Sequence, residues 1–227
     1  MRAVHFCREC GKVQPPVPVD YFVFFGLPYK LNLDTAQLER EFYGLSRHLH
    51  PDINAIGSDR ERQWSLEKSS QLNDAYRTLK DPISRTEYFL RLHGVEPEEQ
   101  SKAATDEARR TGQVKKQVVP PDLLEQVFEL NMQLEEMRMN KKVGEEDRTL
   151  EGELRDAKQQ LQAKHDSLME ELQTTWSDSD ALVDRADRGE PVLEDDHKAV
   201  RNRMLSVLNR RSYLRNLLRD VDEVLET

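Results

Sequence analysis

Apolar residues in the first third of the chain recur at the spacing of an amphipathic helix. Asp34 begins such a segment, since Gln37 follows it three residues later, as in a capping box. The apolar positions beyond it are spaced four, three and four apart, which places them on one face of a helix; they are Leu38, Phe42, Leu45 and Leu49. The pattern predicts a helix that ends near Leu49.

A second helix is predicted after a turn. The segment from His50 to Ser58 contains Pro51 and Gly57, both poor helix formers, and is expected to be a loop. From about Asp59 apolar and charged residues again occupy opposite sides of a helix. The apolar side consists of Leu72, Ala75, Tyr76 and Leu79. This helix should lie against the first one and form a hairpin with it.

Two short helices should flank this hairpin. An apolar stretch begins at Tyr21, after a lead-in that contains three prolines. Asp81 before Pro82 predicts the start of a short final helix, because Asp is a preferred N-cap and proline suits the first helical position. Gly94 should end that helix, since glycine is the usual residue just past a helix terminus.

The rest of the chain is predicted to be a polar linker followed by a helical bundle. Nearly every residue between Glu96 and Val119 is polar or charged, so this stretch cannot bury a core. Beyond it, apolar residues at helical spacing predict helices over about 122–142, 147–176 and 194–225, with a short helix or loop between the last two. The predicted parts are therefore a leader (1–19), a first domain (20–94), a linker (95–119) and a bundle (120–227).

The middle segment of the bundle carries a seam at heptad spacing, formed by Leu150, Leu154, Ala157, Leu161, Leu168 and Leu172. His165 completes this spacing. A lone histidine in such a seam is more often a partly exposed or satisfied core residue than a ligand, so we assign it no function. Three antiparallel helices would bury these stripes together, in the manner of a coiled coil. The whole chain is thus expected to be all-α.

The first bundle segment carries two apolar rows. One row is Leu123, Val127, Leu130, Leu134 and Met137, and it suffices for core packing. The second row is Leu124, Phe128 and Met132. It makes the apolar face wider than one seam of a three-helix bundle needs. The second row either stays exposed as a groove for a partner or packs inward or against the first domain, and the residues alone favour neither.

Composition limits the function classes. Charged residues make up 34% of the 227 residues and the formal net charge is -9, which disfavours nucleic acid and favours protein partners. No run approaches the ~20 apolar residues of a membrane span, and the first residues lack an apolar signal core, so a cytoplasmic protein is expected. A Gly-rich phosphate loop, an H-E-x-x-H motif and a nucleophile elbow are absent from the sequence. We predict neither an enzyme nor a catalytic residue.

The two cysteines of the chain, Cys7 and Cys10, are followed by Gly11 and resemble half of a zinc knuckle. They are too close together to staple a domain, which fits a reducing compartment. A closed structural zinc site needs four ligands, and His5 could supply a third. A free or degenerate pair, zinc shared with another chain or a partner, and redox chemistry all remain open. We expect no other cofactor.

His50, Pro51 and Asp52 stand between the two hairpin helices, where a proline-braced loop could present polar groups to a partner. The tripeptide alone is a weak signal. Its surroundings are "DYFVFFGLP", "LDTAQLEREFYGLSRHLHPD" and "LNDAYRTLKDPISRTEYFLRLHG". Together they resemble a J domain and, more narrowly, the HscB family, the J-proteins of iron-sulfur cluster biogenesis. The resemblance is specific from Asp20 to Gly94.

The resemblance implies that the His-Pro-Asp turn docks on the nucleotide-binding domain of a DnaK- or HscA-class chaperone and promotes ATP hydrolysis there. Arg47 matches a basic position of the family, and Arg40 also faces outward by its spacing on the same helix. Ile53 stands where many J domains have Lys, and Glu41 where relatives are often basic. The electrostatic part of docking is therefore expected to be weaker here.

The resemblance also implies a client surface. The stretch "LLEQVFELNMQLEE" looks like the part of HscB that holds IscU, the scaffold on which iron-sulfur clusters assemble. Leu124, Phe128 and Glu129 match in kind, Tyr213 matches an aromatic position of the same surface, and Met132 adjoins it where relatives tend to carry Glu. The implied function is a co-chaperone that delivers this scaffold for cluster assembly or transfer. A J-protein for another client, or a helical interaction protein with an incidental His-Pro-Asp, are the alternatives.

Overall fold

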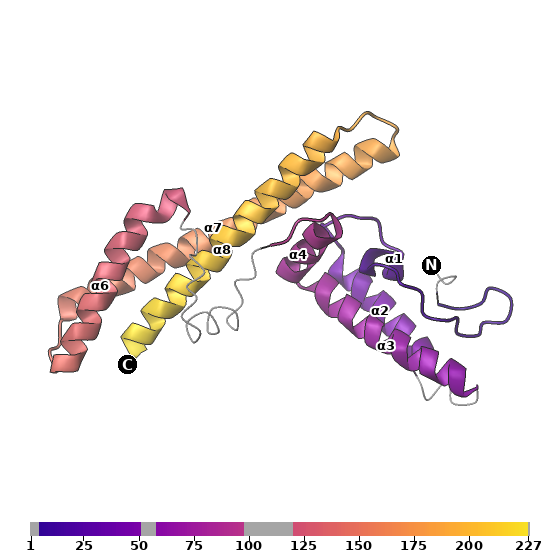
Figure 1. Cartoon of the computed structure of the whole chain (residues 1–227), viewed down its shortest axis with the longest axis horizontal. Coiled ribbons are helices and arrows are strands. Elements are labelled where there is room, and N and C mark those ends of the chain that lie inside the picture. The colour runs from indigo at the N-terminus through magenta and orange to yellow at the C-terminus, as the bar shows by residue number, and fades with distance from the viewer. Residues whose placement is uncertain (1–4, 51–57, 98–119, 227) are drawn as a thin grey trace. The chain divides into compact units, whose positions relative to one another are not determined.

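The structure is a computed structural model that describes residues 5–50, 58–97 and 120–226, apart from the side chain of Pro121. Within these ranges it contains helices and one isolated β-bridge (Figure 1). The helices are α1 (Tyr21–Phe25), α2 (Thr35–Leu49), α3 (Asp59–Lys80), α4 (Pro82–Leu92), η2 (Pro121–Leu123), α6 (Leu124–Val143), α7 (Arg148–Asp187) and α8 (Glu194–Glu226). The predicted all-α class is confirmed. None of these helices is both long enough and apolar enough to cross a membrane.

Contacts divide the chain into two compact units. The first consists of Met1–Glu96 and Trp176–Val200, and the second of Pro97–Thr175 and Arg201–Thr227. Residues 176–200 therefore pack with the N-terminal segment, although the sequence analysis placed them in the bundle. The predicted linker lies outside the described residues from residue 98 onward.

The hairpin of α2 and α3 forms the core of the first unit. Asp34 caps α2, because its side chain accepts hydrogen bonds from the backbone N–H groups of Ala36 and Gln37. Ser58 and Glu61 form a reciprocal capping box at the start of α3. The two helices bury the apolar residues Leu38, Leu49, Leu72, Ala75 and Leu79 between them and their neighbours. The predicted hairpin and its N-cap at Asp34 are confirmed.

Both predicted flanking helices are present, and α4 ends where the sequence indicated. Asp20 caps α1, a helix of one turn that buries Phe22, Phe24 and Phe25. Asp81 caps α4 by accepting the backbone N–H of Ser84, and Pro82 occupies the first position of that helix. The chain leaves α4 through Gly94, whose φ of +71° lies in the left-handed region that glycine adopts without strain.

Helix α7 is longer than expected, since it continues through residues 177–187, where the sequence analysis placed a short helix or loop. The sequence SDSDALVDRAD contains no helix-breaking residue, and its Leu182 is buried. The helix ends only before Gly189, which has a φ of +73°, and Pro191. The additional turns carry the residues that attach this segment to the hairpin.

Asp180 on these additional turns anchors the segment between α1 and α2. Its Oδ1 accepts the backbone N–H of Leu31 at 2.7 Å, and its Oδ2 accepts the backbone N–H and the side-chain amide of Asn32, both at 2.9 Å. One turn further along α7, Asp184 forms an ion pair with Lys30. The buried carboxylate of Asp180 thus satisfies three donors of a segment that has no regular secondary structure of its own.

Trp176 makes the second attachment within the first unit. Its indole N–H donates to Oγ1 of Thr86 on α4 at 2.9 Å, and both side chains are buried. The guanidinium of Arg85 lies 5.0 Å from the indole centroid, within the range of a cation–π interaction. A buried indole N–H needs a partner, so this hydrogen bond fixes the orientation of Trp176 on α4.

The second unit is a three-helix bundle made from α6, the first part of α7 and the last part of α8 (Figure 1). Gln133 pairs with Glu153, and Gln126 with Lys164, so α6 and α7 are antiparallel. Lys141 at the end of α6 donates to the carbonyl of Val224 at the end of α8, so these two helices run in the same direction. The up-down-up bundle confirms the predicted arrangement.

The bundle core is the one that the heptad spacing indicated. Helix α7 buries Leu150, Leu154, Leu161, Leu168 and Leu172. Helix α6 contributes Leu123, Val127, Leu130, Leu134 and Met137 from its N-terminal end and body. His165 is partly buried in the seam, and its Nδ1 lies 3.3 Å from Oδ1 of Asp166.

We predict that Asp180→Ala lowers the free energy of unfolding by roughly 2–4 kcal/mol, because it leaves buried backbone N–H groups without acceptors. Urea unfolding monitored by circular dichroism would measure the difference. Asp187→Ala, which removes an exposed carboxylate from the end of the same helix, serves as the control and should change the value by less than about 0.5 kcal/mol. Equal effects of the two substitutions would contradict the anchoring role of Asp180.

Candidate functional site

The end of α2 presents the first candidate site. His50 is the C-cap of α2, has an extended backbone with φ -62° and ψ +130°, and is exposed. Arg40 and Arg47 are also exposed, and their separation of seven residues places them on one side of the helix. The structure thus brings three of the predicted docking residues to one solvent-facing side of α2. Pro51 and Asp52 lie outside the described residues.

Two serines that sequence reasoning missed hold the end of α2 in place. The hydroxyls of Ser65 and Ser69 on α3 both donate to the backbone carbonyl of Leu49, the residue before His50. This carbonyl belongs to the last turn of α2 and has no partner within the helix. One sequence signal could have identified them: the two serines are four residues apart, which places both on the inner face of α3.

The leader packs against α1 through His5. His5 is buried, its Nε2 lies 2.9 Å from the carbonyl oxygen of Phe24, and the two rings are 4.4 Å apart between centroids. Burial lowers the pKa of His5 below its ordinary 6.5; the hydrogen bond to Phe24 acts in the opposite direction, and the charge of Lys68 adds to the lowering. His5 is therefore a neutral packing residue at pH 7.

The cysteine pair does not gather a full set of metal ligands. Cys7 is half-buried and Cys10 is exposed, and both are free thiols. His5, considered as a third ligand, directs its Nε2 to a backbone carbonyl instead. Among the described residues, no group of three or more potential ligands is arranged to hold a metal ion. A closed zinc site thus does not fit the described part of this chain alone, and zinc shared with a second molecule stays a hypothesis.

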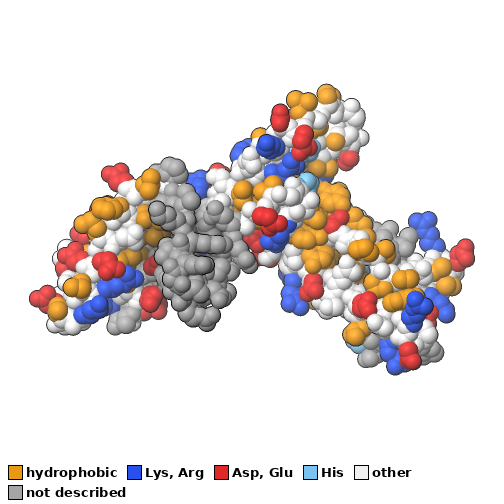
Figure 2. Space-filling model, viewed as in Figure 1, with side chains coloured by type: hydrophobic (Ala, Val, Ile, Leu, Met, Phe, Trp, Pro, Cys, Tyr) orange, Lys and Arg blue, Asp and Glu red, His pale blue; other side chains and the backbone are white. Residues whose placement is uncertain are grey.

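The exposed face of α6 presents the second candidate site. Leu124, Phe128 and Met132 are 54%, 70% and 60% exposed, respectively, whereas Val127 and Leu130 are buried on the opposite side. Within its unit, this row therefore does not pack inward, which was one of the open alternatives. Glu129 is exposed beside it. Figure 2 shows hydrophobic side chains along the visible surface of α6, at the left of the view.

The exposed apolar row extends further along α6 than the sequence analysis proposed. Met139 and Val143 are 59% and 70% exposed and lie on the same side of the helix as Met132. Sequence reasoning missed them because Glu135 and Glu136 interrupt the spacing of the row. Helix α6 is therefore apolar on two faces: one packs in the bundle, and the other is exposed within the described part of this unit.

Tyr213 does not lie on this exposed row, although the resemblance assigned it to the same surface. It is only 7% exposed, on a turn of α8 that also buries Leu214, Leu217 and Leu218. Burial raises the pKa of its hydroxyl, with a smaller contribution from the charge of Asp220. In this structure Tyr213 is thus part of the bundle core.

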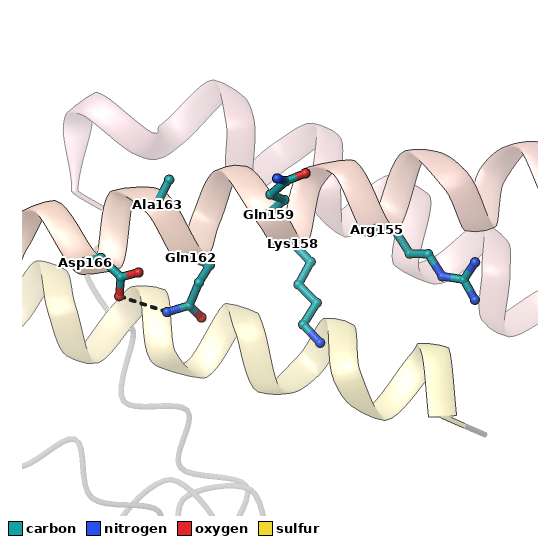
Figure 3. Close-up of a pocket in the computed structure, with 6 residues that line it drawn as sticks. All are labelled: Arg155, Lys158, Gln159, Gln162, Ala163 and Asp166. Atoms are coloured by element: carbon teal, nitrogen blue, oxygen red, sulfur yellow. Dashed lines mark hydrogen bonds between the residues drawn. The ribbon is translucent and has the colours of Figure 1, made fainter.

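A shallow polar groove beside α7 is a third surface feature (Figure 3). It is lined by Arg155, Lys158, Gln159, Gln162, Ala163 and Asp166. Several of its polar groups already have partners: Gln162 donates to Asp166 at 2.9 Å, and Lys158 forms an ion pair with Asp222 of α8. The groove contains none of the predicted site residues, and we assign no ligand to it.

The class of the protein follows from this geometry: a helical hairpin with an exposed histidine at its turn, flanked by two short helices, is the arrangement of a J domain, here accompanied by a helical bundle. No family model matches the chain. The "Co-chaperone protein HscB homolog" of Vibrio cholerae is 45% identical over 78 residues, which are 34% of this chain and 46% of that protein. Its counterpart in Vibrio atlanticus is 47% identical over 76 residues, 34% of this chain and 44% of that protein. The match thus spans less than half of these curated relatives.

Two solved structures share the fold. Chaperone HscB from Vibrio cholerae aligns over 92% of this chain and 98% of its own, with a TM-score of 0.53 and 24% identity. Human co-chaperone protein HscB aligns over 96% and 88%, with a TM-score of 0.56 and 23% identity. At these identities the structures show a common fold alone. The chain is thus similar in sequence over about a third of its length, and in fold over most of it, to HscB co-chaperones.

We predict that acidification weakens the attachment of the leader. Because the pKa of His5 is lower in the folded protein than its ordinary 6.5, the detached leader binds more protons than the attached one at mildly acidic pH. Attachment is therefore complete above about pH 6.5 and weakens as the pH falls below it. The protection factor of the Gln14 amide, which donates to the carbonyl of His5, should be lower at pH 5.5 than at pH 7.5.

His5→Gln supplies the control for this measurement, because its amide can still donate to a carbonyl but does not titrate. In this variant the protection factor of Gln14 should be independent of pH over the same interval. A pH dependence of equal size in both proteins would show that His5 is not its source.

Proposed function

We propose that this protein is a J-type co-chaperone of iron-sulfur cluster biogenesis that stimulates a DnaK- or HscA-class ATPase and delivers an IscU-type scaffold to it. The observation that carries the proposal is the end of α2, where an exposed His50 follows a carbonyl held by Ser65 and Ser69. The similarity to HscB co-chaperones supports it. The chaperone contributes the hydrolysis of ATP, and we assign no catalytic residue to this chain.

Rigid presentation of His50 is the physical basis of the proposed stimulation. A loop that is ordered before binding loses less conformational entropy when it docks. The hydroxyls of Ser65 and Ser69 fix the backbone immediately before His50, so this part of the turn needs no further ordering. Arg40 and Arg47 add positive charge on the same side of α2, which would favour an acidic docking surface and raise the association rate at low salt.

The N-terminal part of the exposed row of α6 is the proposed client surface. Leu124, Phe128 and Met132 expose more than half of their surface in the free protein, and burial against a client would release the water around them. Full burial of one such side chain contributes about 1.5–3 kcal/mol, so a few of them supply much of a micromolar affinity. Exposed carboxylates beside the row, including Glu129, favour a client surface with basic residues around an apolar centre.

A J-protein that serves a different client remains the second candidate, because the exposed row of α6 identifies an apolar partner and not a particular protein. The helical interaction protein with an incidental tripeptide is less well supported, since it gives no reason for the two serines that fix the end of α2.

We predict that His50→Gln abolishes stimulation of the cognate chaperone. At saturating co-chaperone the steady-state ATPase rate should fall to about the basal rate, because the exposed imidazole next to the docking turn is lost. The assay measures phosphate release with purified chaperone and full-length protein. His93→Gln at the end of α4 is the matched control and should retain stimulation. A wild-type protein that leaves the rate at its basal value would refute the co-chaperone function itself.

For the client surface we predict that the double substitution Leu124→Ser and Phe128→Ser weakens binding of an IscU-type scaffold by about 2–4 kcal/mol, or roughly 30- to 700-fold. Isothermal titration calorimetry with the purified scaffold gives the affinity. Val143→Ser is the matched control, since Val143 is exposed to the same 70% as Phe128 but lies outside the segment that resembles HscB. Equal losses for both variants would indicate general apolar adhesion and not a defined client site.

A further inference from the structure

The leader folds into a small hairpin around the cysteine pair. Phe6 and Val13 form an antiparallel β-bridge, and the backbone N–H of Cys7 donates to the carbonyl of Lys12 at 2.8 Å. The turn is closed by the N–H of Gly11, which donates to the carbonyl of Cys7 at 3.0 Å. Gly11 has a φ of +71°, a conformation that glycine adopts without a steric penalty. Both cysteines therefore lie within one fixed turn.

The two thiols lie three residues apart in one hydrogen-bonded turn. The backbone amides of Cys10 and Glu9, followed by the Cys10 side chain, hold the pKa of Cys7 below its ordinary value. Cys10 is exposed and Cys7 is half-buried, so small molecules can reach the pair. Two accessible thiols held within one turn are the arrangement that thiol–disulfide exchange requires.

The same hairpin contacts both helix ends that lead to the His-Pro-Asp turn. The ring of Phe6 lies 6.0 Å from that of His48 in the last turn of α2. Lys12 forms an ion pair of 3.2 Å with Glu61 in the first turn of α3. Phe6 directly precedes Cys7, and Lys12 is two residues after Cys10, so the residues on either side of the cysteine turn make these contacts. Val13 is buried and anchors the base of the hairpin.

We propose that Cys7 and Cys10 form a dithiol–disulfide switch that adjusts how the leader holds the ends of α2 and α3, and thereby how well the protein stimulates its chaperone. The second half of this proposal rests on the proposed function. The first half, formation of the disulfide, concerns the leader alone and can be tested without a chaperone.

The oxidant is a small-molecule disulfide of the glutathione type. The Cys7 thiolate attacks one of its sulfurs, the S–S bond breaks, and a small thiolate leaves and takes up a proton. The thiol of Cys10 then loses its proton and attacks the Cys7 sulfur of the mixed disulfide, which expels the second small thiol. In total two protein thiols are oxidised and one small disulfide is reduced to two thiols. A disulfide brings the sulfurs to about 2.05 Å and replaces the two thiols of the turn by one covalent bond.

The first experiment follows the exchange by intact-protein mass spectrometry after addition of oxidised glutathione to the reduced full-length protein. The chain has two cysteines, so every product can be assigned. We expect the wild-type protein to lose two hydrogens with no adduct retained, Cys10→Ser to stop at one glutathione adduct, and Cys7→Ser to react several-fold more slowly. Equal rates for the two single variants would overturn the assignment of Cys7 as the attacking thiol.

The second experiment compares reduced and oxidised protein in the chaperone ATPase assay. We expect the half-saturating concentration to differ roughly three- to tenfold between the two forms, the size that one or two weak surface contacts allow. The double variant Cys7→Ser and Cys10→Ser should be insensitive to oxidant, and scaffold binding should not change in any form. An unchanged half-saturating concentration would overturn the switch. If reduced protein gives no stimulation at all, the proposed function fails, whereas the disulfide chemistry is still decided by the first experiment.

Addition of Zn²⁺ distinguishes the disulfide switch from a metal site shared between two chains. If Zn²⁺ protects the thiols from glutathione at one ion per two chains, the pair is a shared metal site and the exchange proposal is overturned. If oxidation proceeds at the same rate with equimolar Zn²⁺ present, the dithiol reaction stands.

Discussion

The carboxylate of Asp180 holds the first unit together, because it attaches the end of α7 to the segment between α1 and α2. It accepts hydrogen bonds from Leu31 and from Asn32, which is 148 residues away in sequence. The segment between α1 and α2 has no regular secondary structure to supply acceptors for these N–H groups. The carboxylate of Asp180 accepts them instead. Little conformational entropy is lost, because α7 already holds Asp180 in place. Trp176, one turn earlier on α7, makes a second attachment by donating its indole N–H to Thr86 of α4.

Local chemistry predicted local structure well. Asp34, Asp81 and Gly94 mark helix ends through interactions with residues three or four positions away, and these signals need no tertiary information. The two apolar rows of α6 were likewise visible, because helical geometry alone separates Val127 from Phe128 by about 100°. The last turns of α7 were missed: nothing in residues 177–187 stops a helix, but their sparse apolar content gave no hydrophobic stripe from which to predict one.

Features that depend on distant partners could not be predicted. Asp180 is one aspartate among many on charged helices, and only the fold brings the N–H of Leu31 to it. The pairing of Ser65 and Ser69 with the carbonyl of Leu49 also depends on how α2 and α3 pack. For Tyr213 the resemblance predicted a place on the client surface, whereas the packing of the bundle buries this residue in the core. Sequence patterns thus identify faces and ends, whereas burial of a particular polar group is a property of the assembled structure.

The second apolar face of α6 also has a consequence for the free protein in solution. A helix surface with Leu124, Phe128, Met132, Met139 and Val143 exposed is an obvious contact for a second copy of itself, and hydrophobic attraction between copies would compete with any other ligand. The formal charge of -9 opposes this, because like-charged chains repel over a Debye length of about 10 Å at moderate salt. High ionic strength screens this repulsion and strengthens apolar contacts. The tendency of the free chain to self-associate is therefore set by the balance between its acidic composition and the exposed apolar row of α6.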